Sequence, residues 1–218
     1  MNKPYEKFFE MAEPRPEDKS KKYYHGTSTK VAADGILKTG IQPPDLGNRK
    51  GQMTPVKGKV YLTPNLKYAV IYATGANMLG SELPESMIIK EPIGYLFVVY
   101  GKQLRDVQPD EDYIGELIGM NSDHHKCPQW LHDMAKHALT PNQFRKVLEG
   151  EYAYWAQAGK KLVKLMSDEQ KLELVSLGAS IAHGGAIIPD EAWEFDKTLN
   201  VKLKKDGSNF FKLAKRVK

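Results

Sequence analysis

The stretches Tyr23-Tyr24-His25-Gly26-Thr27-Ser28 and Lys59-Val60-Tyr61-Leu62-Thr63-Pro64 decide the fold that the sequence predicts. Each combines β-branched or aromatic residues with small polar residues at its end, which is typical of a strand that opens onto a site. The second continues into a helical segment at 66–73, so that Tyr72 follows Tyr61 by eleven positions. A strand and a helix that each present an aromatic ring can hold a flat ring between two π faces. The spacing therefore predicts a nicotinamide pocket and points to NAD as the substrate.

Length and composition predict a soluble protein with one sizeable domain, or one domain with a large insert. The chain has 218 residues, of which 41% are hydrophobic and 27% are charged. It has no apolar run of the roughly 20 residues that a membrane helix needs, and residues 1–22 lack the apolar core of a secretory signal. Cys127 is the single cysteine, which excludes an internal disulfide and suits a reducing compartment. We therefore expect a cytoplasmic protein without a membrane partner.

The net charge of +5 favours an anionic partner without identifying it. The excess of lysine and arginine is concentrated at 202–205 and 212–218, near the end of the chain. Such a segment can lie against phosphates and raise affinity for nucleic acid, although a solvated tail or a frayed last helix is the commoner explanation.

The order of predicted elements indicates an α+β fold in which the helices are segregated. Residues 1–22 form an N-terminal extension with a helix at 3–12, and residues 23–218 form the domain, with a helical insertion at about 112–177. Thr63 is expected to cap the helix after the second strand, with Pro64 at its first position. The remaining predictions are a helix at 30–39 closed by Gly40, a long loop at 41–58, a strong strand at 93–101, helix starts at Pro128, Thr140 and Ser167, and late strands at 179–183, 186–189 and 199–203.

His25, Gly26 and Thr27 form the first candidate site. A glycine directly after the histidine lets a ligand approach the backbone, whose N–H and C=O can read a carboxamide. The imidazole and the Thr27 hydroxyl would then bond ribose hydroxyls. The structural alternative stays open, because a histidine at a strand end is often structural and Tyr61 and Tyr72 are compatible with an ordinary core.

Four segments in order, 24–27, 36–41, 60–63 and 69–73, resemble the ADP-ribosyltransferase superfamily. The branch is the one of poly(ADP-ribose) polymerases and diphtheria toxin, which carries a His-Tyr-Glu triad; RNA 2′-phosphotransferases and rifamycin ADP-ribosyltransferases share similar opening motifs. The resemblance covers about residues 20–110 well. It implies a split, strongly twisted β core that binds NAD in a cleft.

The resemblance also implies roles for individual residues. His25 would bond the adenine ribose, and Gly26 would hold the nicotinamide amide through its backbone. Tyr61 and Tyr72 would sandwich the nicotinamide ring, and the NAD contacts would further include Thr27, Leu62 and Thr63. Nicotinamide would leave through an oxocarbenium-like transition state, which needs a carboxylate to steady the positive ribose.

That carboxylate is where the sequence departs from the family pattern. The position that aligns with the glutamate of the triad is Gly185. Glu191 is the expected substitute and the third catalytic candidate beside His25 and Tyr61, and an acid in the first turn of a helix is its structural alternative. Further candidates for the carboxylate are Asp190 and Glu194, which flank Glu191, and the acidic turn Asp110-Glu111-Asp112. His183 is a separate candidate, as a site residue that faces the cleft.

The sequence thus predicts an NAD-dependent mono-ADP-ribosyltransferase, a glycosyltransferase similar to toxin-like phage enzymes. It would pass a single ADP-ribose to a macromolecular acceptor, with protein favoured over nucleic acid. One alternative is an RNA 2′-phosphotransferase with Arg49 and Lys50 on the phosphate, and another is a non-catalytic NAD-binding or structural module. A zinc site is not expected, because the cluster of His124, His125, Cys127, His132 and His137 has poor ligand spacing.

Overall fold

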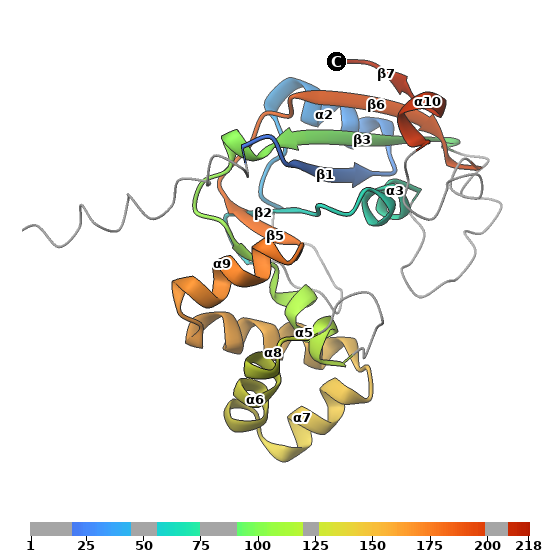
Figure 1. Ribbon diagram of the computed structural model, residues 1–218. Coiled ribbons are helices and arrows are strands. Elements are labelled where there is room, and N and C mark those ends of the chain that lie inside the picture. Colours follow the sequence, from blue (N-terminus) through green and yellow to red (C-terminus); the bar gives the residue numbers. More distant parts are fainter. Residues whose placement is uncertain (1–18, 45–55, 75–90, 120–126, 199–208) are drawn as a thin grey trace, which may run out of the picture. The chain divides into compact units, whose positions relative to one another are not determined.

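The computed structural model describes residues 19–44, 56–74, 91–119, 127–198 and 209–218. The chain divides into two compact units (Figure 1). Unit 1 comprises Met1–Pro43, Val60–Asp106 and His183–Lys218, and unit 2 comprises Pro44–Lys59 and Val107–Ala182. Antiparallel sheets combine with separate helices, so the predicted α+β class is confirmed. None of the helices in the described ranges is both long and apolar enough to cross a bilayer.

Unit 1 is built on a four-stranded antiparallel sheet of order β1-β3-β6-β7. The strands are β1 (Lys22–Thr27), β3 (Ile93–Tyr100), β6 (Glu191–Asp196) and β7 (Lys215–Arg216). Strand β3 lies between β1 and β6, as Figure 1 shows. The register places Tyr24, Val98 and Glu191 level across three strands. Directly opposed residues project from the same face of a sheet, and their sequence neighbours project from the other.

The prediction of a strand at 186–189 is wrong. Only an isolated bridge between Ile41 and Ile187 forms there, and the next strand begins at Glu191. Glu191 is therefore not an acid in the first turn of a helix. The predicted helix at 3–12 and the predicted strand at 199–203 lie outside the described residues.

Helix α3 (Leu66–Thr74) approaches the sheet of unit 1 unusually closely, because glycines face it. A Cβ atom at Gly26 of β1 would lie 2.0 Å from the carbonyl oxygen of Ala69, and one at Gly94 of β3 would lie 2.8 Å from that of Ala73. Ala69 and Ala73 are four residues apart and share a helix face. Small residues on both sides thus let the helix backbone rest on the strands, over a core completed by Leu96, Val70, Phe195 and Phe210.

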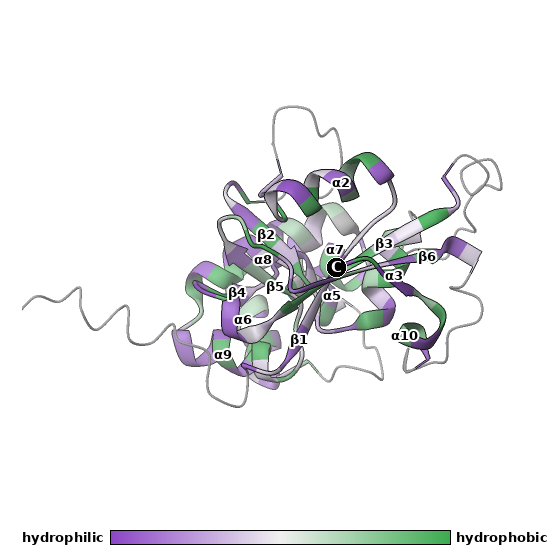
Figure 2. Ribbon diagram, turned by 90° about the horizontal axis from the view of Figure 1, so that it is seen from above, coloured by the Kyte–Doolittle hydropathy of each residue, from purple (hydrophilic) through white to green (hydrophobic). Residues whose placement is uncertain are grey.

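The caps of two helices in unit 1 test the local predictions. Helix α2 (Lys30–Thr39) has the predicted bounds, with Thr29 as its N-cap and Gly40 at φ 84° after its end. Its hydrophilic and hydrophobic residues are mixed along its length (Figure 2). The predicted cap of α3 is wrong, because Asn65 accepts the Tyr68 N–H at 3.3 Å and α3 begins two residues after Pro64.

A second sheet has the order β2-β5-β4. Its strands are β2 (Lys59–Leu62), β5 (Ile181–Gly184) and β4 (Gln108–Pro109). The boundary between the units runs through β5, after Ala182. Short helices adjoin two strands of unit 1: η3 (Gly101–Gln103) continues from β3, and α10 (Phe210–Leu213) precedes β7.

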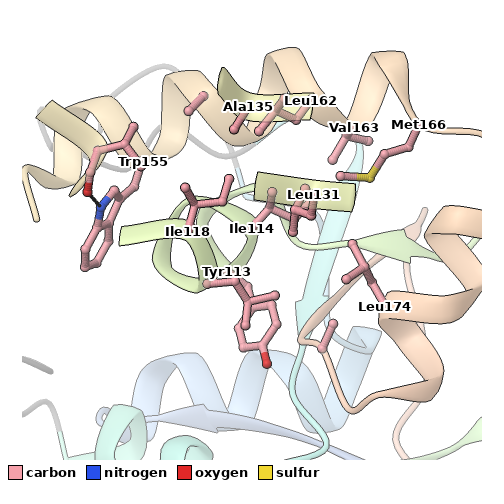
Figure 3. Close-up of a cluster of buried hydrophobic side chains, with 14 of the residues drawn as sticks. Tyr113, Ile114, Ile118, Leu131, Ala135, Trp155, Leu162, Val163, Met166 and Leu174 are labelled. Carbon is pink, nitrogen blue, oxygen red and sulfur yellow. Dashed lines mark hydrogen bonds between the residues drawn. The ribbon is translucent and has the colours of Figure 1, made fainter. Parts of the chain in front are cut away.

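Unit 2 consists mainly of helices around one apolar core (Figure 3). Trp155 is buried in this core: its indole N–H donates to the Val147 carbonyl at 2.9 Å, and Gly115 and Gly119 of the facing helix leave room for its side chain and backbone. The predicted helix starts at Thr140 and Ser167 are confirmed, and both residues form capping boxes. The helices are α5 (Glu111–Gly119), α6 (Gln129–Ala138), α7 (Pro141–Leu148), α8 (Tyr152–Leu165) and α9 (Asp168–Ser176).

Candidate functional site

The two sequence motifs meet where β2 parts from β1, within unit 1. The main chains of Tyr24 and Thr63 exchange two hydrogen bonds, of 2.8 and 3.0 Å, in an isolated antiparallel bridge. Continued register would set Leu62 opposite His25 and Tyr61 opposite Gly26. No main-chain hydrogen bond joins those residues. The split therefore begins at the His25-Gly26 pair.

The backbone of Gly26 faces this split. The N–H and C=O of Tyr24 hydrogen-bond to Thr63, on the side of β1 that faces β2. Main-chain groups alternate in direction along an antiparallel strand, so the N–H and C=O of His25 point toward β3 and the N–H and C=O of Gly26 point toward β2. Nothing within the described part of the chain hydrogen-bonds the Gly26 N–H or C=O. One donor and one acceptor thus stand side by side at the start of the split, which is the pattern that a carboxamide needs.

The imidazole of His25 is oriented by the other strand. Its Nδ1 lies 3.1 Å from the carbonyl oxygen of Tyr61, so that Nδ1 carries the proton and donates. The same assignment makes Nε2 of the neutral ring an acceptor, suited to a ribose hydroxyl. His25 and Tyr61, which are 36 positions apart in the sequence, are thereby brought together.

The other predicted NAD contacts lie in the same unit. Tyr61 is half-buried, and Tyr72 on α3 exposes 47% of its surface, so Tyr72 is not an ordinary core residue. Thr27 is half-buried at the end of β1, whereas Leu62 is buried. The Thr63 hydroxyl accepts the Asn65 N–H at 3.1 Å, which gives this side chain a structural role at the start of α3.

Glu191 is not brought to the face of the sheet that carries His25. Glu191 is level with Val98 and Tyr24, whereas His25 is level with Phe97 and Ala192. Adjacent positions along a strand project from opposite faces. Glu191 therefore shares the face of Tyr24 and Gly26, on which α3 lies, and the sheet itself separates its carboxylate from the imidazole.

Hydrogen bonds hold the Glu191 carboxylate on its own face. It accepts from the Tyr100 hydroxyl at 2.6 Å and from the Trp193 indole at 3.0 Å, and the Lys22 ammonium lies 3.5 Å away. Burial acts to raise the pKa of Glu191, but these two hydrogen bonds and the charges of Lys22 and Arg216 outweigh it and lower the pKa. Such a carboxylate stays ionised and has the environment of a structural acid. The sequence does not single out Tyr100 or Lys22, although both flank β-strand ends.

The neighbouring acids differ in position. Asp190 accepts the Tyr100 N–H at 2.8 Å and so fastens the start of β6 to β3. Glu194 is level with Tyr95 and Thr27, and therefore projects from the face that carries His25. Its carboxylate pairs with the Lys215 ammonium at 2.9 Å. Of the two candidate acids within β6, Glu191 and Glu194, Glu194 is the one on the same face as the histidine.

His183 and Gly185 also belong to unit 1. His183 is buried, and its Nδ1 accepts the Arg105 N–H at 3.1 Å, so its proton resides on Nε2. Gly185, which the resemblance aligns with the glutamate of the triad, has φ 82°, and a Cβ atom added there would meet no other atom within 4 Å. This left-handed backbone, rather than crowding, favours glycine after the end of β5.

The acidic turn Asp110-Glu111-Asp112 opens helix α5 in unit 2. Asp110 caps the helix, accepting the Asp112 N–H at 3.0 Å. Burial, then the charges of Asp112 and Glu111, raise the pKa of Asp110 to about 8, and burial with Glu111 raises the pKa of Asp112 to about 6. The turn is thus a helix start at which like charges are crowded together.

This crowding predicts a pH-dependent stability that Asp110→Asn removes. A carboxyl whose pKa is raised by folding binds its proton more tightly in the folded state, so the stability it contributes is present at low pH and lost as pH rises from about 4 to about 8. We expect the thermal midpoint of Asp110→Asn to exceed that of the unmodified chain at pH 8 and to converge with it at about pH 4. Asparagine remains a good N-cap.

Thermal scans across this pH range check the expectation. Asp133→Asn on the exposed surface of α6 is the matched control, and it should leave the pH dependence unchanged. An Asp110→Asn protein whose midpoint follows the pH as steeply as the unmodified chain would contradict the assignment.

The sequence cluster considered for zinc offers no metal centre within the described ranges, from which His124 and His125 are left out. Burial raises the pKa of the Cys127 thiol to about 11, so it is not a thiolate ready to bind a cation. The His132 ring packs edge-on against Phe144 at 5.3 Å between centroids, which gives it a packing role.

Comparison of the chain with protein-family models, with curated proteins and with solved structures finds no match.

Proposed function

We propose that this chain is an NAD-dependent ADP-ribosyltransferase with a split β core, which transfers a single ADP-ribose to a macromolecular acceptor. The observation that carries the proposal is the Gly26 backbone: its N–H and C=O face the point where β1 and β2 part, next to the imidazole of His25. Those two groups match the carboxamide of nicotinamide, the leaving group of NAD.

The aromatic residues support the same ligand. Tyr61 lies on the strand that parts from β1, and Tyr72 is 47% exposed on α3, which packs directly on Gly26. Since α3 and His25 lie on opposite faces of the sheet, a ligand that contacts both Tyr72 and His25 would have to pass through the split between β1 and β2. A pyridinium ring bound between two phenol rings would gain stacking and, because it is cationic, attraction to the π faces. His25 would accept a ribose hydroxyl through Nε2.

In the proposed reaction, the bond between nicotinamide and ribose breaks and the electron pair leaves with nicotinamide. The ribose becomes an oxocarbenium-like cation, and a nucleophile of the acceptor then forms the new bond and loses its proton. Glu194 is the acid that we assign to steadying this charge, since it shares the face of His25. Glu191, the acid that the sequence favours, is assigned to holding β1, β3 and β6 together.

A second candidate is an NAD-binding module without turnover. The position of Glu191 on the opposite face from His25 favours it, because the expected third member of the triad is then missing from the site. For the RNA 2′-phosphotransferase alternative, Arg49 and Lys50 lie outside the described residues.

Incubation with NAD labelled in both halves tests the proposal. The transferase predicts release of nicotinamide and incorporation of the ADP-ribose label into protein or nucleic acid of a lysate. The binding module predicts a rise in thermal midpoint with NAD but neither product. Absence of binding, release and transfer together would refute both, and removal of the phosphate from a 2′-phosphorylated RNA would favour the phosphotransferase.

A further inference from the structure

Positive side chains gather at one end of the unit 1 sheet, and we propose that this end binds the backbone of a single-stranded nucleic acid. It is the end at which β1 begins, β3 ends, β6 begins and the segment after β7 returns to β6. We call it the basic end and define it by six side chains: Lys19, Lys21, Lys22, Lys102, Arg216 and Lys218.

Main-chain hydrogen bonds fix these residues on one frame. The N–H of Gly101 donates to the Lys21 carbonyl at 2.9 Å, and that of Lys102 donates to the Lys19 carbonyl at 3.1 Å. The segment before β1 therefore runs beside η3, and lysines of both segments lie together. A binding surface held by backbone bonds loses less conformational entropy on association than a free tail does.

The last residues complete the basic end from the other side. Strand β7 pairs with β6, with Arg216 opposite Trp193, and C marks the chain end beside these strands in Figure 1. The Lys218 N–H then donates to the Ala192 carbonyl at 3.2 Å, and its ammonium reaches the Pro189 carbonyl at 2.7 Å. The basic segment at 212–218 is thus docked on the sheet rather than a free tail.

The charges at this end are only partly neutralised. Lys22 pairs with Glu191 at 3.5 Å, and Lys102 lies 3.9 Å from Asp190. The Lys102 side chain remains 62% exposed, and Lys19, Arg216 and Lys218 are also exposed. An anion with several regularly spaced charges fits this surface.

Aromatic rings among the cations favour a nucleic acid over an acidic peptide. Lys22 and Lys102 lie 5.3 and 5.6 Å from the centre of the Tyr100 ring, and the Arg216 guanidinium lies 5.9 Å from that of Trp193. Both rings are half-buried. Proteins that bind single strands combine such cations with aromatic rings on which bases stack, and an acidic peptide offers no bases to stack. Lys22 and His25 are three positions apart on β1, about 10 Å along the strand.

Fluorescence anisotropy with a labelled single-stranded RNA of about 20 nucleotides tests the inference, at salt concentrations from about 50 to 200 mM. If about four phosphates are engaged, the logarithm of the affinity should fall with the logarithm of salt with a slope of about −3. The triple variant Lys19→Gln/Lys102→Gln/Lys218→Gln should reduce the slope by about 2 and weaken binding about tenfold or more at low salt.

The matched control is Lys38→Gln/Lys136→Gln/Lys164→Gln, which removes the same charge from exposed positions elsewhere. It should stay within about twofold of the unmodified chain. No binding by the unmodified chain, or equal losses in the two triple variants, would overturn the assignment. Displacement of the RNA by poly-L-glutamate at equal charge concentration would also overturn it, in favour of an acidic protein. None of these readouts depends on NAD turnover.

Discussion

Replacing His25 with alanine is expected to reduce release of nicotinamide from NAD by about 100-fold, because catalysis depends on how accurately the ligand is positioned. The substitution removes Nε2 as a ribose acceptor and also the Nδ1 hydrogen bond of 3.1 Å to the Tyr61 carbonyl, which links the strands at the split. His25→Asn can still donate to that carbonyl and should recover part of the loss. Turnover of labelled NAD is the measurement.

Three variants separate an effect on the site from an effect on the whole protein. His137→Ala, at an exposed position on α6 in unit 2, should leave turnover unchanged. Glu191→Gln should lower the thermal midpoint, because a buried acceptor of three contacts loses its charge. It should nevertheless retain turnover in the folded protein, while Glu194→Gln should not. A Glu191→Gln protein that folds normally but lacks turnover would show that Glu191, and not Glu194, is the catalytic acid.

Replacing Gly26 with alanine should destabilise unit 1 by about 3 kcal/mol, since overpacking of this severity exceeds what side-chain adjustment absorbs. The added Cβ would lie 2.0 Å from the Ala69 carbonyl oxygen and 2.8 Å from the Ala73 nitrogen. Both are backbone atoms of α3, so the helix must move away from β1. Thermal or urea unfolding followed by circular dichroism measures the change.

Gly35→Ala is the control in the same unit. A Cβ at Gly35 on α2 meets no atom within 4 Å, and alanine is the better helix former, so this variant should gain about 0.5–1 kcal/mol. Equal unfolding midpoints for the two variants would show that α3 does not rest on Gly26. Because α3 also carries Tyr72, Gly26→Ala should weaken the thermal shift produced by NAD as well.

The elements that the sequence predicts well are those whose signals are local. Helix α2 has its cap at Thr29 and its terminating glycine at Gly40 within the segment itself, and the capping boxes at Thr140 and Ser167 are equally local. The helical segment predicted at 66–73 matches α3, but its cap is missed because three polar or proline residues precede the helix. Thr63 and Asn65 are both suitable cap residues by type. In the folded chain the Thr63 hydroxyl accepts the Asn65 N–H, and the Asn65 side chain accepts the Tyr68 N–H and so caps the helix.

By itself, the sequence determined the α+β class, the helical texture of 112–177, and the presence of a His-Gly strand and of a Tyr strand that leads into a helix. The tertiary structure alone decided that Glu191 lies behind the sheet and that Gly26 presents its backbone at the split. The physical reason is register: a residue's face, and the direction of its N–H and C=O, depend on which residue of a distant strand stands opposite. That choice is made by contacts between segments as far apart in the chain as Lys22 and Glu191, which no local pattern contains.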